Sequence, residues 1–139
     1  MELNIAALHE AVAAAVPERD CIVWRDRRLS WRTVGERTRR LANVIAAAGL
    51  GAHRASNELG GSESGQDHLA LYLHNGNEYL EGLLGACKAR VAPVNINYRY
   101  VAKELAYVLG DCRARGVIFH GRFAATLAEV LPALDPPAL

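Results

Sequence analysis

Residues 88–111 read K-A-R-V-A-P-V-N-I-N-Y-R-Y-V-A-K-E-L-A-Y-V-L-G-D, and this stretch decides the fold. The apolar run at 91–95 predicts a strand, followed by an Asn/Tyr/Arg turn and an amphipathic helix over about 101–109. Pro93 predicts an edge or bulged strand, because proline cannot donate to a sheet ladder. A short strand that leads directly into a helix is typical of a parallel sheet with crossover helices.

The flanking sequence continues this alternation. The apolar run 68–73 predicts a strand, and Asn77 is placed to cap a helix that ends near residue 88. A further strand is predicted over 116–120 and a last helix over about 122–130. Together these elements predict an α/β fold with a mostly parallel sheet flanked by helices.

The N-terminal part predicts two helices around a small hairpin. Asn4 can cap a helix that reaches about residue 16, and short strands are expected at 21–24 and 28–30 around a polar turn. Ser30 can cap the next helix, and Gly49 lies where a glycine commonly ends one. The expected buried positions are Ile5, Leu8, Val12 and Val16 on the first helix, and Val34, Leu41, Val44, Ile45 and Ala48 on the second.

Residues 51–67 read G-A-H-R-A-S-N-E-L-G-G-S-E-S-G-Q-D and predict a long exposed loop, because they lack periodicity and are rich in Gly and Ser. Within it, Gly60–Gly65 could cradle a phosphate through backbone amides. Such a cradle needs a helix N-terminus behind it, whereas this loop leads into a strand and carries Glu63. A loop without phosphate binding is therefore the favoured interpretation.

Composition excludes several classes of protein. The chain has 139 residues, of which 51% are hydrophobic and 22% charged, so a globular domain is expected. Sixteen Lys and Arg nearly cancel fifteen Asp and Glu, which gives no argument for nucleic acid as a partner. We expect a cytoplasmic protein, without a secretory signal or a membrane span. Cys21, Cys87 and Cys112 have no metal or redox spacing and predict buried, reduced thiols.

Two groups of residues could carry chemistry. An arginine cluster could bind phosphates, but Glu36 lies four residues from both Arg32 and Arg40, which predicts ion pairs on a solvated or inter-subdomain face. The histidines show no metal-ligand spacing, although His74 and His120 follow strand ends, where open parallel sheets bind ligands. The full sets are Arg25, Arg27, Arg28, Arg32, Arg37, Arg39 and Arg40, and His9, His53, His68, His74 and His120.

The turn Asn95–Tyr100 allows two interpretations. Asn side chains satisfy backbone groups at turns, so these residues can be purely structural. Alternatively, Tyr98, Arg99 and Tyr100 could contribute to a ligand tunnel or to a contact between subdomains, where Tyr and Arg are typical anchors.

From Asn4 to about Leu131 the order of motifs resembles the beginning of AMP-forming acyl-CoA synthetases, the adenylate-forming ligases. It is most similar to mycobacterial-type fatty-acid–CoA ligases. The sharpest matching run is Pro93-Val-Asn-Ile-Asn-Tyr-Arg-Tyr100. The other matching segments are Val16–Arg19, Leu29–Val34, Leu41–Asn43, Leu71–Tyr79, Lys88-Ala89 and Glu104-Leu105.

The chain departs from the family pattern at two positions. Thr33-Val34 stands where relatives commonly have Glu-Leu, which removes the glutamate of a capping box. Arg90 stands where relatives usually have glycine, so the conformational freedom of glycine is lost. The 51–67 loop is longer than in most relatives, although it resembles an insertion in some mycobacterial-type members.

The resemblance implies an enzyme that makes an acyl-adenylate from ATP and a fatty acid and then a thioester with CoA. In such ligases the phosphate loop, the adenine motif, the ribose aspartate and the catalytic lysine all lie beyond the stretch represented here. No catalytic, cofactor-binding or metal-binding residue can therefore be assigned in this chain. ATP, Mg and CoA are implied for the full-length relative, and none is expected to bind this chain alone.

Residues 1–139 are accordingly expected to form a single partial domain, with Asp135-Pro136-Pro137 leading into a further part of the protein. The main interpretation is the N-terminal portion of a fatty-acid–CoA ligase, inactive alone. The alternatives are a non-catalytic module that binds acyl chains and an interaction module. Expected partners are a fatty acid in the complete enzyme, and either the C-terminal remainder or a second copy.

Overall fold

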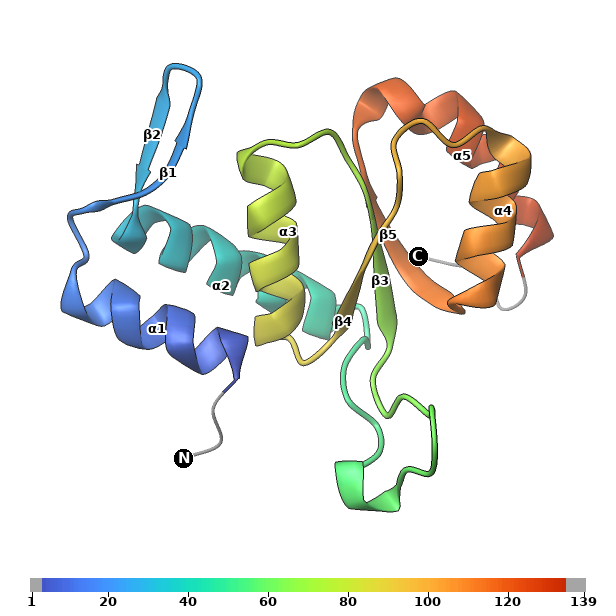
Figure 1. The fold of residues 1–139 in the computed structure, drawn as a ribbon, viewed down its shortest axis with the longest axis horizontal. Helices are drawn as coiled ribbons and strands as arrows, with labels where there is room; N and C mark the ends of the chain where they lie inside the picture. Colours follow the sequence, from blue (N-terminus) through green and yellow to red (C-terminus); the bar gives the residue numbers. More distant parts are fainter. Residues whose placement is uncertain (1–3, 135–139) are drawn as a thin grey trace.

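A three-stranded parallel sheet with helices on both faces forms the centre of the computed structural model, which describes residues 4–134 (Figure 1). The predicted Asp135–Pro137 linker lies outside the described residues. The elements are α1 (Ile5–Ala15), β1 (Asp20–Trp24), β2 (Arg27–Ser30), α2 (Trp31–Ala47), η1 (Ser56–Glu58), β3 (His68–Tyr72), α3 (Asn77–Lys88), β4 (Ala92–Asn95), α4 (Ala102–Asp111), β5 (Ala114–Phe119), η2 (Gly121–Phe123), α5 (Ala124–Val130) and η3 (Leu131–Ala133).

The sheet has the strand order β4-β3-β5, and both outer strands run parallel to β3. The predicted α/β fold with a mostly parallel sheet is therefore confirmed. Strand β4 lies at an edge of the sheet, as Pro93 predicts, and pairs with β3 in the register Leu69 to Pro93.

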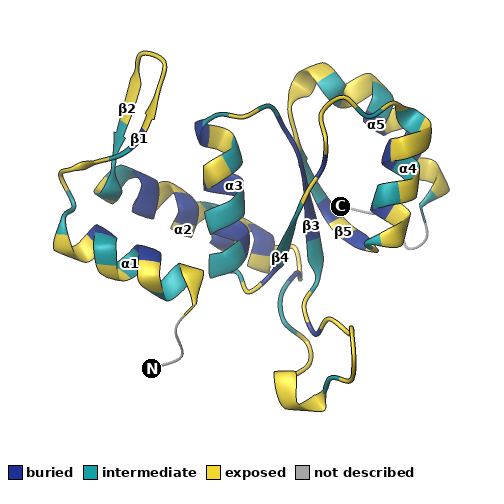
Figure 2. Ribbon diagram, in the orientation of Figure 1, coloured by how far each residue is buried: buried dark blue, intermediate teal, exposed yellow. Residues whose placement is uncertain are grey.

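Residues 69–72 of β3 are buried because helices cover both faces of the strand, as Figure 2 shows in dark blue. Successive side chains alternate between the faces. Leu69 and Leu71 belong to a core with α2 and α3, whereas Ala70 and Tyr72 belong to a second core with α4 and α5. The buried members are Ile45, Leu50, Leu69, Leu71, Ala86 and Val91 in the first core, and Ala70, Tyr72, Ile96, Leu105, Leu109, Ala114, Leu127 and Val130 in the second.

Helix α1 begins as predicted but buries a different face. The Asn4 side chain accepts a hydrogen bond from the Ala7 amide at 2.8 Å, which confirms the cap. However, Ile5 and Leu8 are 58% and 55% exposed, Val12 and Val16 are only half-buried, and the fully buried residues are His9 and Ala13. Because the helix is rich in alanine, several of its faces are apolar, and contact with α2 and α3 selects the face that packs closely.

The predicted buried stripe of α2 is partly wrong. Val34 and Ile45 are buried and Leu41 is half-buried, but Val44 and Ala48 are exposed. Thr38 and Ala42 fill the stripe instead. The sequence does not suggest a buried threonine, yet its hydroxyl donates to the Val34 carbonyl at 2.7 Å and is thereby satisfied within the helix.

Both predicted ends of α2 are confirmed. The Ser30 hydroxyl accepts from the Thr33 amide at 3.2 Å, and the hydroxyls of Ser30 and Thr33 lie 3.0 Å apart, so the cap forms without the glutamate of a capping box. Gly49 follows the helix with a φ of 81°, the left-handed conformation that favours glycine at this place.

Asn77 is not the cap of α3, contrary to the prediction. Gly76 occupies the cap position, and Asn77 is the first helical residue. Its side chain is buried and donates to a Glu81 carboxylate oxygen one turn further along α3, at 2.9 Å, so the amide is satisfied within the helix.

The ion pairs predicted along α2 are also wrong, because its arginines reach other elements. Arg32 binds Glu18, Arg37 binds Glu81 at 2.7 Å, and Arg39 binds Glu10 at 2.7 Å. An exposed pair within one helix is worth only about 0.3–0.5 kcal/mol, so partners on neighbouring elements easily replace it.

The predicted N-terminal hairpin is confirmed as the antiparallel pair β1–β2, which projects from the body of the molecule in Figure 1. Arg25 adopts a φ of 55° in the two-residue turn, where the sequence offers no glycine. An ion pair of 3.3 Å between Arg27 and Glu78 ties the hairpin to α3.

Arg90 adopts a φ of 61° directly after α3, at the position where the family that the sequence resembles usually has glycine. A left-handed conformation is costly for residues with a Cβ atom. We therefore expect Arg90→Gly to raise the free energy of unfolding by about 0.5–1 kcal/mol in urea titrations. Arg90→Ala is the control, because it removes the charge and keeps the Cβ; an equal gain in that variant would contradict the backbone explanation.

Candidate functional site

A cleft of about 720 Å³ lies at the carboxyl edge of the sheet, where open parallel sheets usually bind ligands. His74 follows β3 and His120 follows β5, and both line the cleft, which confirms their expected place at a pocket edge. The lining residues are Trp24, Arg25, Leu73, His74, Asn75, Gly76, Glu78, Tyr98, Phe119, His120, Gly121 and Arg122.

Aromatic packing surrounds the His74 ring in this cleft. The His74 ring lies 4.8 Å from the ring of Tyr98, 5.3 Å from that of His120 and 4.9 Å from that of Phe123, measured between centroids. Phe123 in turn stacks on Tyr72 of β3 at 4.5 Å. Rings held from several sides lose little further freedom on binding, so the cleft is well suited to a flat or apolar group.

The Asn95–Tyr100 turn has the predicted structural role, and one of its residues also lines the cleft. Asn97 accepts from the Arg99 amide at 3.0 Å, a turn contact of the structural kind. Tyr98 lines the cleft, and the Arg99 guanidinium lies 5.3 Å from the centre of its ring. The Tyr100 carbonyl accepts from the Tyr72 hydroxyl at 3.0 Å and thus anchors the turn to β3.

Of the lining residues, sequence reasoning placed only His74, Tyr98 and His120 at a pocket, and the residues that it missed include two from the hairpin and two beside His120. Trp24 and Arg25 come from the hairpin, and Phe119 and Arg122 flank His120. The rule that ligands bind beyond strand ends identifies Phe119 and Arg122 as readily as it identifies His120. No comparable signal exists for Trp24, because the hairpin reaches the cleft only through tertiary contacts with α3.

The lining residues favour binding over covalent chemistry. Nδ1 of His120 accepts from the Arg122 amide at 3.2 Å, and no carboxylate orients either histidine as a base among the described contacts. Within residues 4–134, no group of His, Cys, Asp and Glu side chains is suitable for holding a metal ion. The cleft offers stacking surfaces and the charges of Arg25, Glu78 and Arg122.

The other candidates from the sequence lie elsewhere. In the 51–67 loop, Glu63 accepts from the Gly60 amide at 3.2 Å, so a carboxylate occupies a donor that a phosphate cradle would need. His53 pairs with Asp67, and His68 contacts the Cys112 carbonyl. Of the arginine cluster, only Arg25 lines the cleft.

The three cysteines are free and half-buried rather than fully buried. Burial raises the pKa of each thiol above its ordinary value. A raised thiol pKa lowers the fraction of thiolate, so none of them has the character of an activated nucleophile.

His9 belongs to the packing of α1 and not to the cleft. It is 6% exposed, and neither ring nitrogen has a hydrogen-bond partner among the described residues. Burial lowers its pKa below the ordinary value of 6.5, and the charges of Lys88 and Arg39 act in the same direction, whereas Glu10 opposes them.

Protonation of His9 therefore favours the unfolded chain. Above pH 6.5 the ring is neutral in both states, and as the pH falls below 6.5 the unfolded state binds the proton more readily. We expect the free energy of unfolding to decrease between pH 7.5 and pH 5.5, and to decrease less in His9→Phe. Urea titrations of both proteins at the two pH values measure this decrease. An equal decrease in the wild-type protein and in His9→Phe would mean that groups other than His9 cause it.

The parallel sheet, the flanking helices and the cleft at the carboxyl edge define the chain as a fold of the type found in the N-terminal domains of adenylate-forming ligases. The structure matches a protein from Rhodopseudomonas palustris described as a long-chain-fatty-acid CoA ligase, with a TM-score of 0.81 and 26% identity over 95% of this chain and 30% of the other. The N-terminal domain of FACL13 from Mycobacterium tuberculosis matches with a TM-score of 0.78 and 24% identity, over 96–97% of this chain and 31% of the other.

The chain belongs to the AMP-binding enzyme family, whose model matches residues 9–138. It is 51% identical to the medium-chain acyl-CoA ligase Mig of Mycobacterium avium, over 94% of this chain and 24% of Mig. It is 32% identical to a 3-oxocholest-4-en-26-oate–CoA ligase of Rhodococcus rhodochrous, over 95% of this chain and 21% of that ligase. The chain thus spans less than a quarter of the length of these relatives. None of its described helices is suited by length and hydropathy to cross a bilayer.

Proposed function

We propose that this chain serves as the N-terminal portion of a fatty-acid–CoA ligase, which forms an acyl-adenylate from ATP and a fatty acid and then a thioester with CoA. One observation carries the proposal. The chain shares 51% identity over nearly its whole length with a ligase named for medium-chain acyl groups. The proposal includes a cytoplasmic location and a single partial domain over residues 1–139.

The described residues do not fit Mg-ATP. No cluster of ligands suits a metal ion, and the Gly60 amide already binds Glu63. We therefore assign no step of the reaction to a residue of this chain and propose that it is inactive by itself. Its part in the ligase would be structural: the sheet and its aromatic cleft would form one wall beside the catalytic remainder.

Exposed aromatic residues around the cleft support this role. Trp24, Tyr98 and Phe119 are 38%, 36% and 41% exposed at the carboxyl edge of the sheet. Aromatic residues that stay exposed together commonly mark a surface that another protein segment covers. The same observation favours the second candidate, an interaction module that assembles with a separate catalytic chain.

A measurement of pyrophosphate release distinguishes a chain that completes a ligase from a non-catalytic module. The purified 139-residue chain, given ATP, Mg and a medium-chain fatty acid, is expected to release no pyrophosphate above the blank. Adding the M. avium relative without its matching N-terminal segment should restore activity if the chain completes the ligase. Pyrophosphate release by the chain alone would refute the proposal that it is inactive by itself. A saturable thermal shift with fatty acid, without restored activity, would favour an acyl-binding module.

A further inference from the structure

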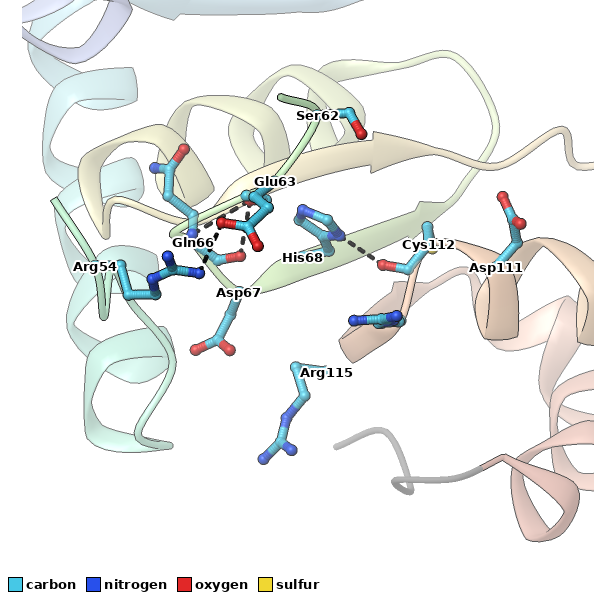
Figure 3. A pocket seen from close by; sticks show the side chains of 11 residues that line it. Arg54, Ser62, Glu63, Gln66, Asp67, His68, Asp111, Cys112 and Arg115 are labelled. Carbon is cyan, nitrogen blue, oxygen red and sulfur yellow. Dashed lines mark hydrogen bonds and ion pairs between the residues drawn. The ribbon is translucent and has the colours of Figure 1, made fainter. Parts of the chain in front are cut away.

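A second cleft, of about 640 Å³, lies at the opposite, amino edge of the sheet. It lies open to solvent between the 51–67 loop and the turn from α4 to β5 (Figure 3). The side chains that line it are almost all polar or charged, in contrast to the aromatic cleft. They are Arg54, Ser62, Glu63, Ser64, Gln66, Asp67, His68, Asp111, Cys112, Arg113 and Arg115.

Two of the three carboxylates in this cleft are already bound. Glu63 pairs with Arg54 at 3.0 Å, a contact that Figure 3 shows across the loop. Asp67 accepts from the Gly51 amide at 3.0 Å and pairs with His53 at 2.5 Å. Burial alone would raise the pKa of Asp67, but these two contacts and the charges of His53 and Arg115 hold it below its ordinary value.

Two guanidinium groups remain without a bound anion. Arg113 and Arg115 make no ion pair and no side-chain hydrogen bond with any residue between 4 and 134. Asp111 is the one lining carboxylate not engaged by another described residue, and its carboxylate and the Arg115 guanidinium point in opposite directions in Figure 3. Arg113 and Arg115, both exposed, are therefore the two guanidinium groups of the cleft that no carboxylate among residues 4–134 contacts.

The wall of the cleft is held in a fixed shape. A Cβ atom at Gly65 would meet the Arg54 carbonyl oxygen at 2.5 Å, so the two arms of the loop are in direct backbone contact. The amides of His53 and Arg54 both donate to the Gly65 carbonyl, at 2.8 and 3.2 Å. A loop closed in this way keeps its cleft open without a ligand, which favours binding.

We propose that this cleft binds a phosphate-bearing small molecule, with Arg113 and Arg115 as its charge partners. Arginine presents several N–H donors in a plane and binds phosphate oxygens in pairs, so two arginines together suit a group with two or more negative charges. The Ser62 hydroxyl at the rim supplies a further donor. This site is separate from the aromatic cleft and does not depend on the proposed ligase function.

Calorimetric titration of the 139-residue chain with pyrophosphate, at constant ionic strength, tests the proposal. We expect saturable binding that weakens about tenfold or more in Arg113→Gln/Arg115→Gln, because charge-assisted hydrogen bonds are lost. Asp111→Asn should tighten binding about two- to threefold by removing an opposing charge. Lys103→Gln/Arg40→Gln is the matched control, since it removes the same net charge outside the cleft.

Two results would overturn the site. One is the absence of saturable binding up to about 10 mM pyrophosphate, a range that covers weak anion sites. The other is an equal loss of affinity in the control variant, which would indicate attraction by net charge alone. Circular dichroism verifies that the double variant is folded, and if it is not, Arg115→Gln and Asp111→Asn carry the same test with opposite expected signs.

Discussion

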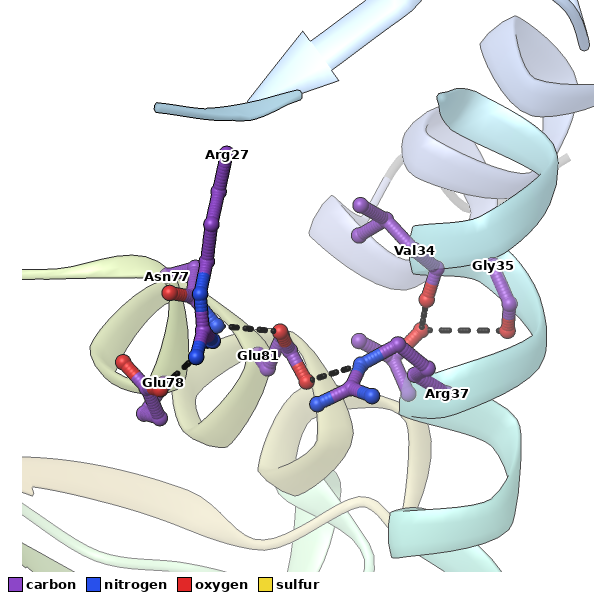
Figure 4. A network of polar contacts seen from close by, with 8 residues as sticks. Arg27, Val34, Gly35, Arg37, Asn77, Glu78 and Glu81 are labelled. Atoms are coloured by element: carbon purple, nitrogen blue, oxygen red, sulfur yellow. Dashed lines mark hydrogen bonds and ion pairs between the residues drawn. The ribbon is translucent and has the colours of Figure 1, made fainter. Parts of the chain in front are cut away.

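Replacing Glu81 by alanine is expected to lower the free energy of unfolding by about 2–3 kcal/mol. Glu81 is 7% exposed and joins two helices, because it accepts from Asn77 at 2.9 Å and from Arg37 of α2 at 2.7 Å (Figure 4). Removing it leaves the buried Asn77 amide and the Arg37 guanidinium without an acceptor. The loss of one partner from a buried pair costs about 3–5 kcal/mol, and the half-exposed Arg37 reduces this value.

Urea titrations of two further variants define this effect. Glu81→Gln keeps one acceptor oxygen but replaces the other by an NH2 donor, so it satisfies only one of the two neighbours and should recover only part of the loss. Glu18→Ala breaks the exposed pair with Arg32 and should stay within about 0.5 kcal/mol of the wild-type protein. A similar loss in Glu81→Ala and Glu18→Ala would mean that burial of the Glu81 network adds nothing.

Gly85→Ala is expected to destabilise the protein by about 1–2 kcal/mol, although alanine favours helices. A Cβ atom at Gly85 would lie 2.7 Å from Cδ2 of Leu41 and 2.8 Å from its Cγ, so α3 and α2 would have to separate. Overpacking of this kind costs about 1–3 kcal/mol. It outweighs the gain in helix propensity, which is at most about 1 kcal/mol.

Gly110→Ala is the matched control, because it makes the same substitution in α4 where nothing lies within 4 Å of the added atom. There we expect stabilisation by about 0.5–1 kcal/mol. The two variants should therefore shift the urea midpoint in opposite directions. Adding Leu41→Ala should recover part of the loss from Gly85→Ala; independent, additive effects of the two changes would contradict the packing explanation.

Part of the candidate site could be predicted from the sequence. His74 and His120 were placed at a pocket edge because strand ends are readable from apolar runs, and parallel strands gather their carboxyl ends at one edge. The amino-edge cleft was not predicted. The 51–67 loop leads directly into β3, and β5 pairs with β3. This pairing brings Arg113 and Arg115 next to the loop, and no local sequence pattern encodes it.

By itself, the sequence determined the order of helices and strands, the α/β class, the caps at Asn4, Ser30 and Gly49, and the edge position of β4. These depend on neighbouring residues: hydrophobic period, capping side chains and the missing donor of Pro93. Only the tertiary structure decided which face of α1 is buried, which acid each arginine binds and what Asn77 does. Those outcomes depend on groups distant in sequence, whose free energies differ by about 1 kcal/mol or less, so packing selects among them.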